Sequence, residues 1–167
     1  MPVRSPKDIR FVADVMLGRL ARWLRVLGYD TLYDPGVPRF LLPVEARREG
    51  RILLTRSPRL LQEHPDVEAY LVHPDRPKEQ LIQVIDHFGL GTDWIFSRCT
   101  LCNRPVEQVA LEEVKNDVPE AVRKMNVAVY RCSGCGKVYW EGSHIQRFRE
   151  FLRGLRLFPE NRMLLDG

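Results

Sequence analysis

The chain has 167 residues, of which 44% are apolar, so it is long and apolar enough for one folded domain with a small additional module. No run approaches the roughly 18 apolar residues of a membrane span, and the N-terminus lacks a secretion signal, so we expect a cytoplasmic protein with no membrane partner. A net charge of +4 and a pI near 9.0 mildly favour an anionic partner.

Short β-like runs alternate with helix-like segments through the first half of the chain. This alternation is typical of a mainly parallel sheet with right-handed crossovers, so we predict an α/β fold with flanking helices. The predicted strands are residues 9–14, 29–34, 51–55 and 67–72, and the predicted helices are residues 16–28, 42–50 and 77–89.

The strand at residues 51–55 ends in a polar turn, "TRSP", that starts at Thr55. The carboxyl ends of parallel strands are where α/β proteins place their ligand sites. Two further candidates follow predicted strands: Asp14 closes "IRFVAD" and Asp34 closes "TLYD". Together they would make a minimal magnesium site. Helix capping by Asp14 and turn formation by Asp34 are equally consistent with the sequence.

Two Cys-x-x-Cys pairs, Cys99 with Cys102 and Cys132 with Cys135, give the strongest signal. Four thiolates can enclose one tetrahedral zinc ion, which would then organise folding and not activate water. A rubredoxin-like iron site has the same ligand set. Disulfides are disfavoured in the cytoplasm, so we predict a structural zinc ribbon.

The composition and residue pattern of the sequence divide the chain into three parts. We predict an α/β domain at residues 1–91, the zinc ribbon at residues 92–142 and a basic amphipathic helix with a tail at residues 143–167. Arginines also recur every third residue on the first helix, at Arg19, Arg22 and Arg25, where they would line a nucleic-acid groove or form a solvated face.

Four ordered blocks resemble the Mut-seven C-terminal RNase family, a PIN-like nuclease domain fused to a zinc ribbon. They are "FVADVMLGRLARWLRVLGYDTLY", "EGRILLTR", "RCTLCNRPVE" and "YRCSGCGKVYWEGSH". The resemblance implies a PIN-like fold, cleavage of RNA with magnesium or manganese held by acids at strand ends, Asp14 as the first acid, and the four cysteines as zinc ligands.

Two expected acids are replaced in this chain. The family commonly has an acidic pair where this sequence has Arg39 and Phe40, and it commonly has Thr-Arg-Asp where this sequence has Thr55, Arg56 and Ser57. A divalent ion that is held by only one or two carboxylates, beside an arginine, should bind weakly. A phosphate oxygen, in contrast, would be favoured by the arginines. Asp34 or Glu45 could restore a ligand.

We therefore expect an RNA-binding protein that resembles a metal-dependent endoribonuclease but has an incomplete acidic centre at Asp14 and Asp34. The candidate RNA-binding residues are Arg19, Arg22, Arg25, Arg39, Arg56 and Arg59. The alternative is a non-catalytic adaptor whose zinc ribbon docks on a protein or a ribonucleoprotein.

Overall fold

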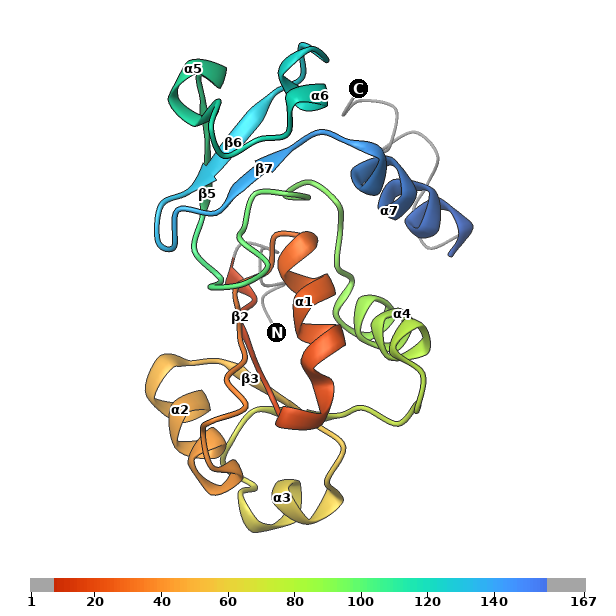
Figure 1. Ribbon diagram of the computed structural model, residues 1–167. Coiled ribbons are helices and arrows are strands. Elements are labelled where there is room, and N and C mark those ends of the chain that lie inside the picture. Colours follow the sequence, from red (N-terminus) through yellow and green to blue (C-terminus); the bar gives the residue numbers. More distant parts are fainter. Residues whose placement is uncertain (1–7, 156–167) are drawn as a thin grey trace.

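A computed structural model describes residues 8–155 of the chain (Figure 1). The first part holds a four-stranded parallel sheet in the order β2-β1-β3-β4. The predicted α/β fold with a parallel sheet flanked by helices is therefore confirmed. Its elements are β1 (Phe11–Ala13), η2 (Val15–Leu17), α1 (Gly18–Val26), β2 (Thr31–Leu32), η3 (Arg39–Leu41), α2 (Leu42–Glu49), β3 (Ile52–Thr55), α3 (Pro58–Glu63), β4 (Ala69–Leu71) and α4 (Pro77–Phe88).

The central strands β1 and β3 are buried along their whole length, because helices cover both faces of the sheet. Side chains alternate between the two faces. Phe11 and Leu54 face a core that α1 and α4 complete, whereas Val12 and Leu53 face a second core that α2 and α3 complete. This packing fixes the strand ends, where Asp14 and Thr55 lie.

The second part contains a three-stranded antiparallel sheet in the order β5-β6-β7. Two short helices cover it through a small valine-rich core that includes Val114 and Val129. Its elements are β5 (Val106–Val109), α5 (Leu111–Val114), α6 (Glu120–Arg123), β6 (Val129–Cys132), β7 (Val138–Trp140) and α7 (Ser143–Gly154). Helix α7 follows this sheet but buries Leu152 in the core of α1 and α4.

Most predicted elements of the first part are present, with one clear omission. The turn after β3 is the start of α3, where the Ser57 side chain accepts a hydrogen bond from the Leu60 N–H and Pro58 occupies the first turn. The predicted C-terminal helix is confirmed as α7, while the tail from residue 156 lies outside the described residues. The three-part division stays a prediction. No helix within residues 8–155 is long and apolar enough to cross a membrane.

Candidate functional site

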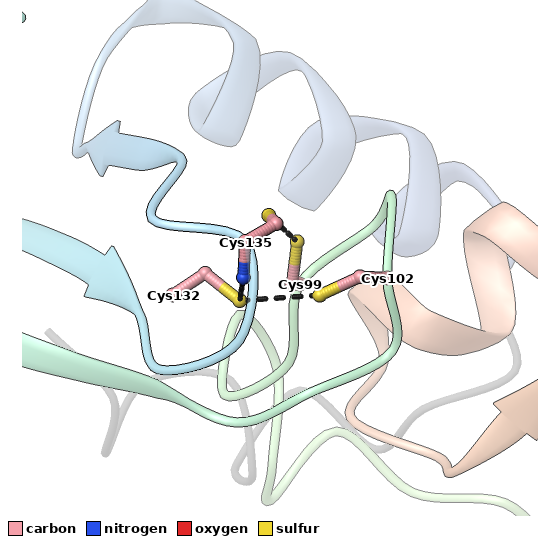
Figure 2. A group of neighbouring side chains, drawn as sticks. All are labelled: Cys99, Cys102, Cys132 and Cys135. Carbon is pink, nitrogen blue, oxygen red and sulfur yellow. Dashed lines mark hydrogen bonds between the residues drawn. The ribbon is translucent and has the colours of Figure 1, made fainter.

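The four cysteines converge at the junction of the two parts of the molecule (Figure 2). Their sulfur atoms all lie within 4.8 Å of one another. The Cys99 and Cys135 sulfurs are 3.7 Å apart, and the Cys102 and Cys132 sulfurs are 3.3 Å apart. A tetrahedral ion with bonds of about 2.3 Å to sulfur requires sulfur separations of roughly 3.8 Å. The cluster therefore fits a single bound metal ion.

Hydrogen bonds favour the thiolate form at Cys99 in particular. At Cys135 the backbone hydrogen bond to Lys137 would lower the pKa, but burial and the other three sulfurs outweigh it and raise the pKa to about 11. The Gly134 N–H lies 3.3 Å from the Cys132 sulfur. Burial alone would raise the pKa of the Cys99 thiol, but hydrogen bonds from the Tyr139 hydroxyl and from backbone N–H groups outweigh it and lower the pKa to about 6. Burial and the Cys99 sulfur raise the pKa of Tyr139 to about 12, so its hydroxyl donates to that sulfur.

A second set of contacts joins the first cysteine pair to the parallel sheet. Arg25 is only 5% exposed, and its Nη1 donates to the carbonyls of Thr100 and Leu101, both at 3.0 Å. Its Nε donates to the Thr31 carbonyl at 2.9 Å. Burial lowers the pKa of Arg25, and the nearby Cys99 and Cys102 thiolates partly offset that effect. Arg25 thus holds the cysteine loop against α1 and β2.

Asn103, directly after Cys102, makes the matching contacts from the loop. Its side-chain oxygen accepts from the Thr31 N–H at 3.0 Å, and its amide donates to Asp30 at 2.6 Å. Asp30 also pairs with buried Arg51, whose Nη1 lies 2.7 Å away. Burial would raise the pKa of Asp30, but hydrogen bonds from Arg51 and Asn103 lower it below its ordinary value.

Asp14 lies at the carboxyl end of β1 and is fully buried. Its Oδ1 accepts from the Val15 N–H at 2.7 Å, which caps η2, and its Oδ2 accepts from the Thr55 hydroxyl at 2.8 Å. The Nε of Arg39 lies 3.2 Å from Oδ1 and 3.1 Å from Oδ2. A guanidinium that is itself partly exposed therefore neutralises this buried carboxylate.

The next strand end continues this network without adding an acid. Ser57 donates its N–H to the Thr55 hydroxyl at 3.1 Å, and Thr55 in turn donates to Asp14. Ser57 is thus one hydrogen-bonded link away from Asp14. Its short side chain caps α3 and brings no negative charge to this edge of the sheet.

The two other candidate acids have local partners of their own. Asp34 is exposed and forms a turn, in which its Oδ1 accepts from the Gly36 N–H at 2.8 Å. Glu45 pairs with Arg48 one turn later on α2. Within residues 8–155, the four cysteines are the single group of three or more potential metal ligands from Cys, His, Asp and Glu. A contribution of Asp34 to a metal at Asp14 stays a prediction.

The six candidate arginines do not form one surface. Arg19, Arg22 and Arg59 are exposed, although Arg59 pairs with Glu63. Arg56 is half-buried and pairs with Asp75. The prediction that Arg25 lines an exposed groove is wrong, because its guanidinium is buried against carbonyl groups.

Three residues that shape these sites were not identified from the sequence. Thr55 holds Asp14, Asn103 joins the cysteine loop to the sheet, and Tyr139 contacts the Cys99 sulfur. The position of Thr55, a polar residue at the end of a buried strand, could have identified it as a site residue. Asn103 has a positive φ of 68°, and asparagine after a Cys-x-x-Cys pair is consistent with such a turn. Nothing local distinguishes Tyr139, whose partner lies forty residues earlier.

A model of the family described as the Mut7-C RNAse domain matches residues 9–152, which confirms the resemblance seen in the sequence. The human protein named "Exonuclease mut-7 homolog" (Homo sapiens) is 23% identical over 233 aligned residues, which cover 92% of this chain. The chain spans 27% of the length of that human protein.

Proposed function

Because the chain belongs to the Mut7-C RNAse domain family, we propose that it binds RNA and that its metal-dependent nuclease centre is incomplete. The observation that carries this proposal is the contact of Arg39 with Asp14. The buried carboxylate already has a cation and two hydrogen-bond donors around it. A magnesium or manganese ion would have to displace Arg39 and would gain no second carboxylate from Ser57.

The same edge suits phosphate better than a metal ion. Arg39 is 43% exposed at its side chain, so its remaining N–H groups can reach a phosphate oxygen while Nε stays on Asp14. Exposed Arg19 begins the next helix, and exposed Arg59 lies on α3, which follows β3. These arginines support an electrostatic RNA contact along this edge.

The test is an RNA binding and cleavage assay on the purified full chain. We expect saturable binding of labelled single-stranded RNA and an affinity that falls steeply with salt. We do not expect manganese-dependent cleavage that is present in the unaltered chain and lost in Asp14→Asn. Arg39→Ala should weaken binding, whereas Lys124→Ala, an exposed cation paired with Glu120 on α6, should not. Asp14-dependent cleavage, or an affinity indifferent to salt, would contradict the proposal.

We further propose that the cysteine cluster holds structural zinc. The chemistry of four thiolates within 4.8 Å of one another supports it, as does the closed donor set, which provides no ligand position for catalysis. Thiols kept as metal ligands also favour a cytoplasmic location. Metal analysis after purification without chelators should give one equivalent of zinc per chain. Iron in its place, or less than one equivalent of any metal, would contradict the assignment.

The adaptor function is a second candidate, and one observation favours it. Exposed apolar side chains lie close along the chain to Asp14 and Arg39, among them Met16 on η2 and Phe40 on η3, which are 60% and 68% exposed. Such a surface is more typical of a protein contact than of a phosphate contact. If the chain has this function, single-stranded RNA will not bind it at physiological salt.

A further inference from the structure

A cavity of about 720 Å³ lies away from the Asp14 edge, at the other end of α1. It is an open cavity between the C-terminal half of α1, the segment 95–100, the antiparallel sheet and helix α7; Figure 1 shows these elements around the upper end of α1. Its volume is within the range of small-molecule and cofactor sites, roughly 300 to 1,000 Å³. Neither Asp14 nor any of the four cysteines lines it.

The floor of the cavity is a row of side chains that crosses the sheet. Gln108 of β5 is paired in register with Tyr130 of β6, and Tyr130 is paired with Tyr139 of β7. All three line the cavity. Because successive residues of a strand point to opposite faces, this row leaves Val129 to the valine core on the other side. The sheet thus presents two neighbouring tyrosine rings to the cavity.

Further aromatic side chains complete the walls. Trp23 of α1, Phe96 of the connecting segment and Phe148 of α7 also line the cavity. The Phe96 and Phe148 rings meet edge to face with their centroids 6.1 Å apart. These rings are half-buried, so they are anchored in the fold and still reach the cavity. Aromatic faces of this kind are what planar rings stack on.

The charge around the cavity is predominantly positive. Among its lining residues are the cations Arg22, Arg98, Lys137 and Arg149, against the single carboxylate of Glu141. Lys137 lies over the Tyr139 ring, with Nζ 5.3 Å from the ring centroid. A ligand for this site should therefore combine a flat ring with negative charge.

We propose that this cavity binds one nucleotide of a single-stranded RNA, with the base stacked on the tyrosine row and its phosphate near Arg22 and Lys137. The inference deepens the proposed RNA binding and rests on it. Stacking on aromatic side chains together with cations along the backbone is how proteins hold unpaired strands. A duplex is disfavoured because its bases are already stacked on one another and are not free to stack on the tyrosines.

Helix α1 connects the cavity with the Asp14 edge. The helix starts close to Asp14, and Arg22 lies within it, with exposed Arg19 one turn before it. From Gly18, the first residue of α1, to Arg22 the rise is about 6 Å at 1.5 Å per residue, and the single turn η2 separates Gly18 from Asp14. One RNA strand can therefore contact both places along the same helix.

The test uses the tryptophans as reporters on the full chain. Trp23 and Trp140 are cavity residues, whereas Trp94, the third tryptophan of the sequence, is not among the lining residues. The probes are a single-stranded octauridine, the same length of RNA duplex, and uridine monophosphate. We expect octauridine to quench the fluorescence saturably and the duplex not to quench it. Uridine monophosphate should quench more weakly, and octauridine should displace it.

Variants then separate stacking from general charge. Tyr130→Ala should weaken octauridine binding roughly five- to 150-fold, the range for loss of one stacked base, while Tyr130→Phe should retain it. The phenylalanine variant loses only the hydroxyl that donates to Glu141. Lys137→Ala should also weaken binding, with Lys124→Ala as the matched control on the same module. Circular dichroism and metal content would verify that each variant is folded.

The outcomes distinguish this inference from the proposed function. RNA binding that survives Tyr130→Ala but is lost in Arg39→Ala would overturn the cavity site and leave RNA binding intact. Equal affinity for duplex and single strand would also overturn it. If uridine monophosphate quenches the fluorescence and octauridine does not displace it, the cavity binds a free nucleotide instead. No RNA binding by the unaltered chain would overturn the proposed function itself.

Discussion

Arg39 and Asp14 form an ion pair across the carboxyl end of the parallel sheet, with the guanidinium Nε 3.1 Å from one carboxylate oxygen and 3.2 Å from the other. Arg39 is the first residue of η3, and Asp14 directly follows β1, so the pair joins η3 to the parallel sheet. Arg39 therefore occupies the carboxylate that a metal ion at Asp14 would need.

The first prediction concerns the restoration of metal binding at Asp14. Ser57→Asp should lower the dissociation constant for Mn²⁺, and the double variant Arg39→Ala with Ser57→Asp should lower it again, roughly tenfold at each step, because affinity follows the net negative charge of the ligands. Calorimetric titration with MnCl₂ measures this. Ser57→Asn is the matched control, since it also caps α3 but adds no charge. An affinity that neither aspartate variant changes would show that Ser57 and Asp14 do not share a site.

The second prediction concerns the stability of the same pair. Asp14→Ala should lower the free energy of unfolding by about 3 kcal/mol, because it leaves buried donors of Thr55 and Val15 without an acceptor. Arg39→Ala should cost less, about 1 to 2 kcal/mol, because Arg39 is partly solvent-exposed. Urea unfolding measures both. Arg47→Ala, which breaks an exposed pair with Asp66, should cost under about 1 kcal/mol; a similar cost for all three variants would contradict the ranking.

The Arg25 contacts lead to the third prediction. Arg25→Lys should lower the unfolding free energy by about 2 kcal/mol, because one ammonium cannot reach the three carbonyls that Nε and Nη1 now contact. Arg22→Lys, one turn earlier on the same helix and exposed, is the control and should change it by less than about 0.5 kcal/mol. Thermal unfolding followed by circular dichroism gives both values. An equal change in unfolding free energy for Arg25→Lys and Arg22→Lys would contradict the stabilising role of the Arg25 contacts.

Metal removal forms the fourth prediction. A chelator should lower the melting temperature and make it depend on zinc concentration, because binding energy at four thiolates is folding energy for this module. Near-ultraviolet circular dichroism should change as well, since Tyr139 contacts the Cys99 sulfur. Cys135→Ser is a second route to the same state. A melting temperature that a chelator does not shift, in protein shown to have lost its metal, would mean that the cluster does not support the fold.

The fifth prediction is a pH dependence of stability from Asp30. Its pKa is lower in the folded chain than the ordinary value of 3.8, so the folded state binds fewer protons than the unfolded state near that pH. The stabilisation is complete above pH 3.8 and is lost as the pH falls through the folded-state pKa. The stability difference between the unaltered chain and Asp30→Asn should thus shrink between pH 7 and pH 3 in urea unfolding. Metal loss at low pH affects both proteins and cancels in the difference; a constant difference would contradict the assignment.

Much of this architecture is readable from local sequence patterns. The apolar run at residues 52–54 predicted β3, and each Cys-x-x-Cys pair is a local signal. The convergence of the two pairs was predicted because four thiolates can share one metal ion. Helix α3 was missed although Ser57 and Pro58 are a helix-start signal, since the segment was interpreted only as a turn.

The candidate site was harder to predict, because its contacts join distant parts of the chain. The step of three residues between Arg22 and Arg25 predicts a common helix face, yet Arg22 is exposed and Arg25 is buried. The difference comes from the carbonyls of Thr100 and Leu101, about 75 residues later, and no periodicity in α1 encodes it. The Arg39 contact with Asp14 is of the same long-range kind.

The burial of Arg25 also constrains how the chain is made. During synthesis the parallel sheet emerges first, at roughly 5 to 20 residues per second. At that moment Arg25 lacks the carbonyls of residues 100 and 101, the Thr31 N–H lacks Asn103, and the core lacks Leu152. These contacts can form only after residues 100–152 have left the ribosome, and until then the donors and the apolar surface of the sheet stay open to solvent.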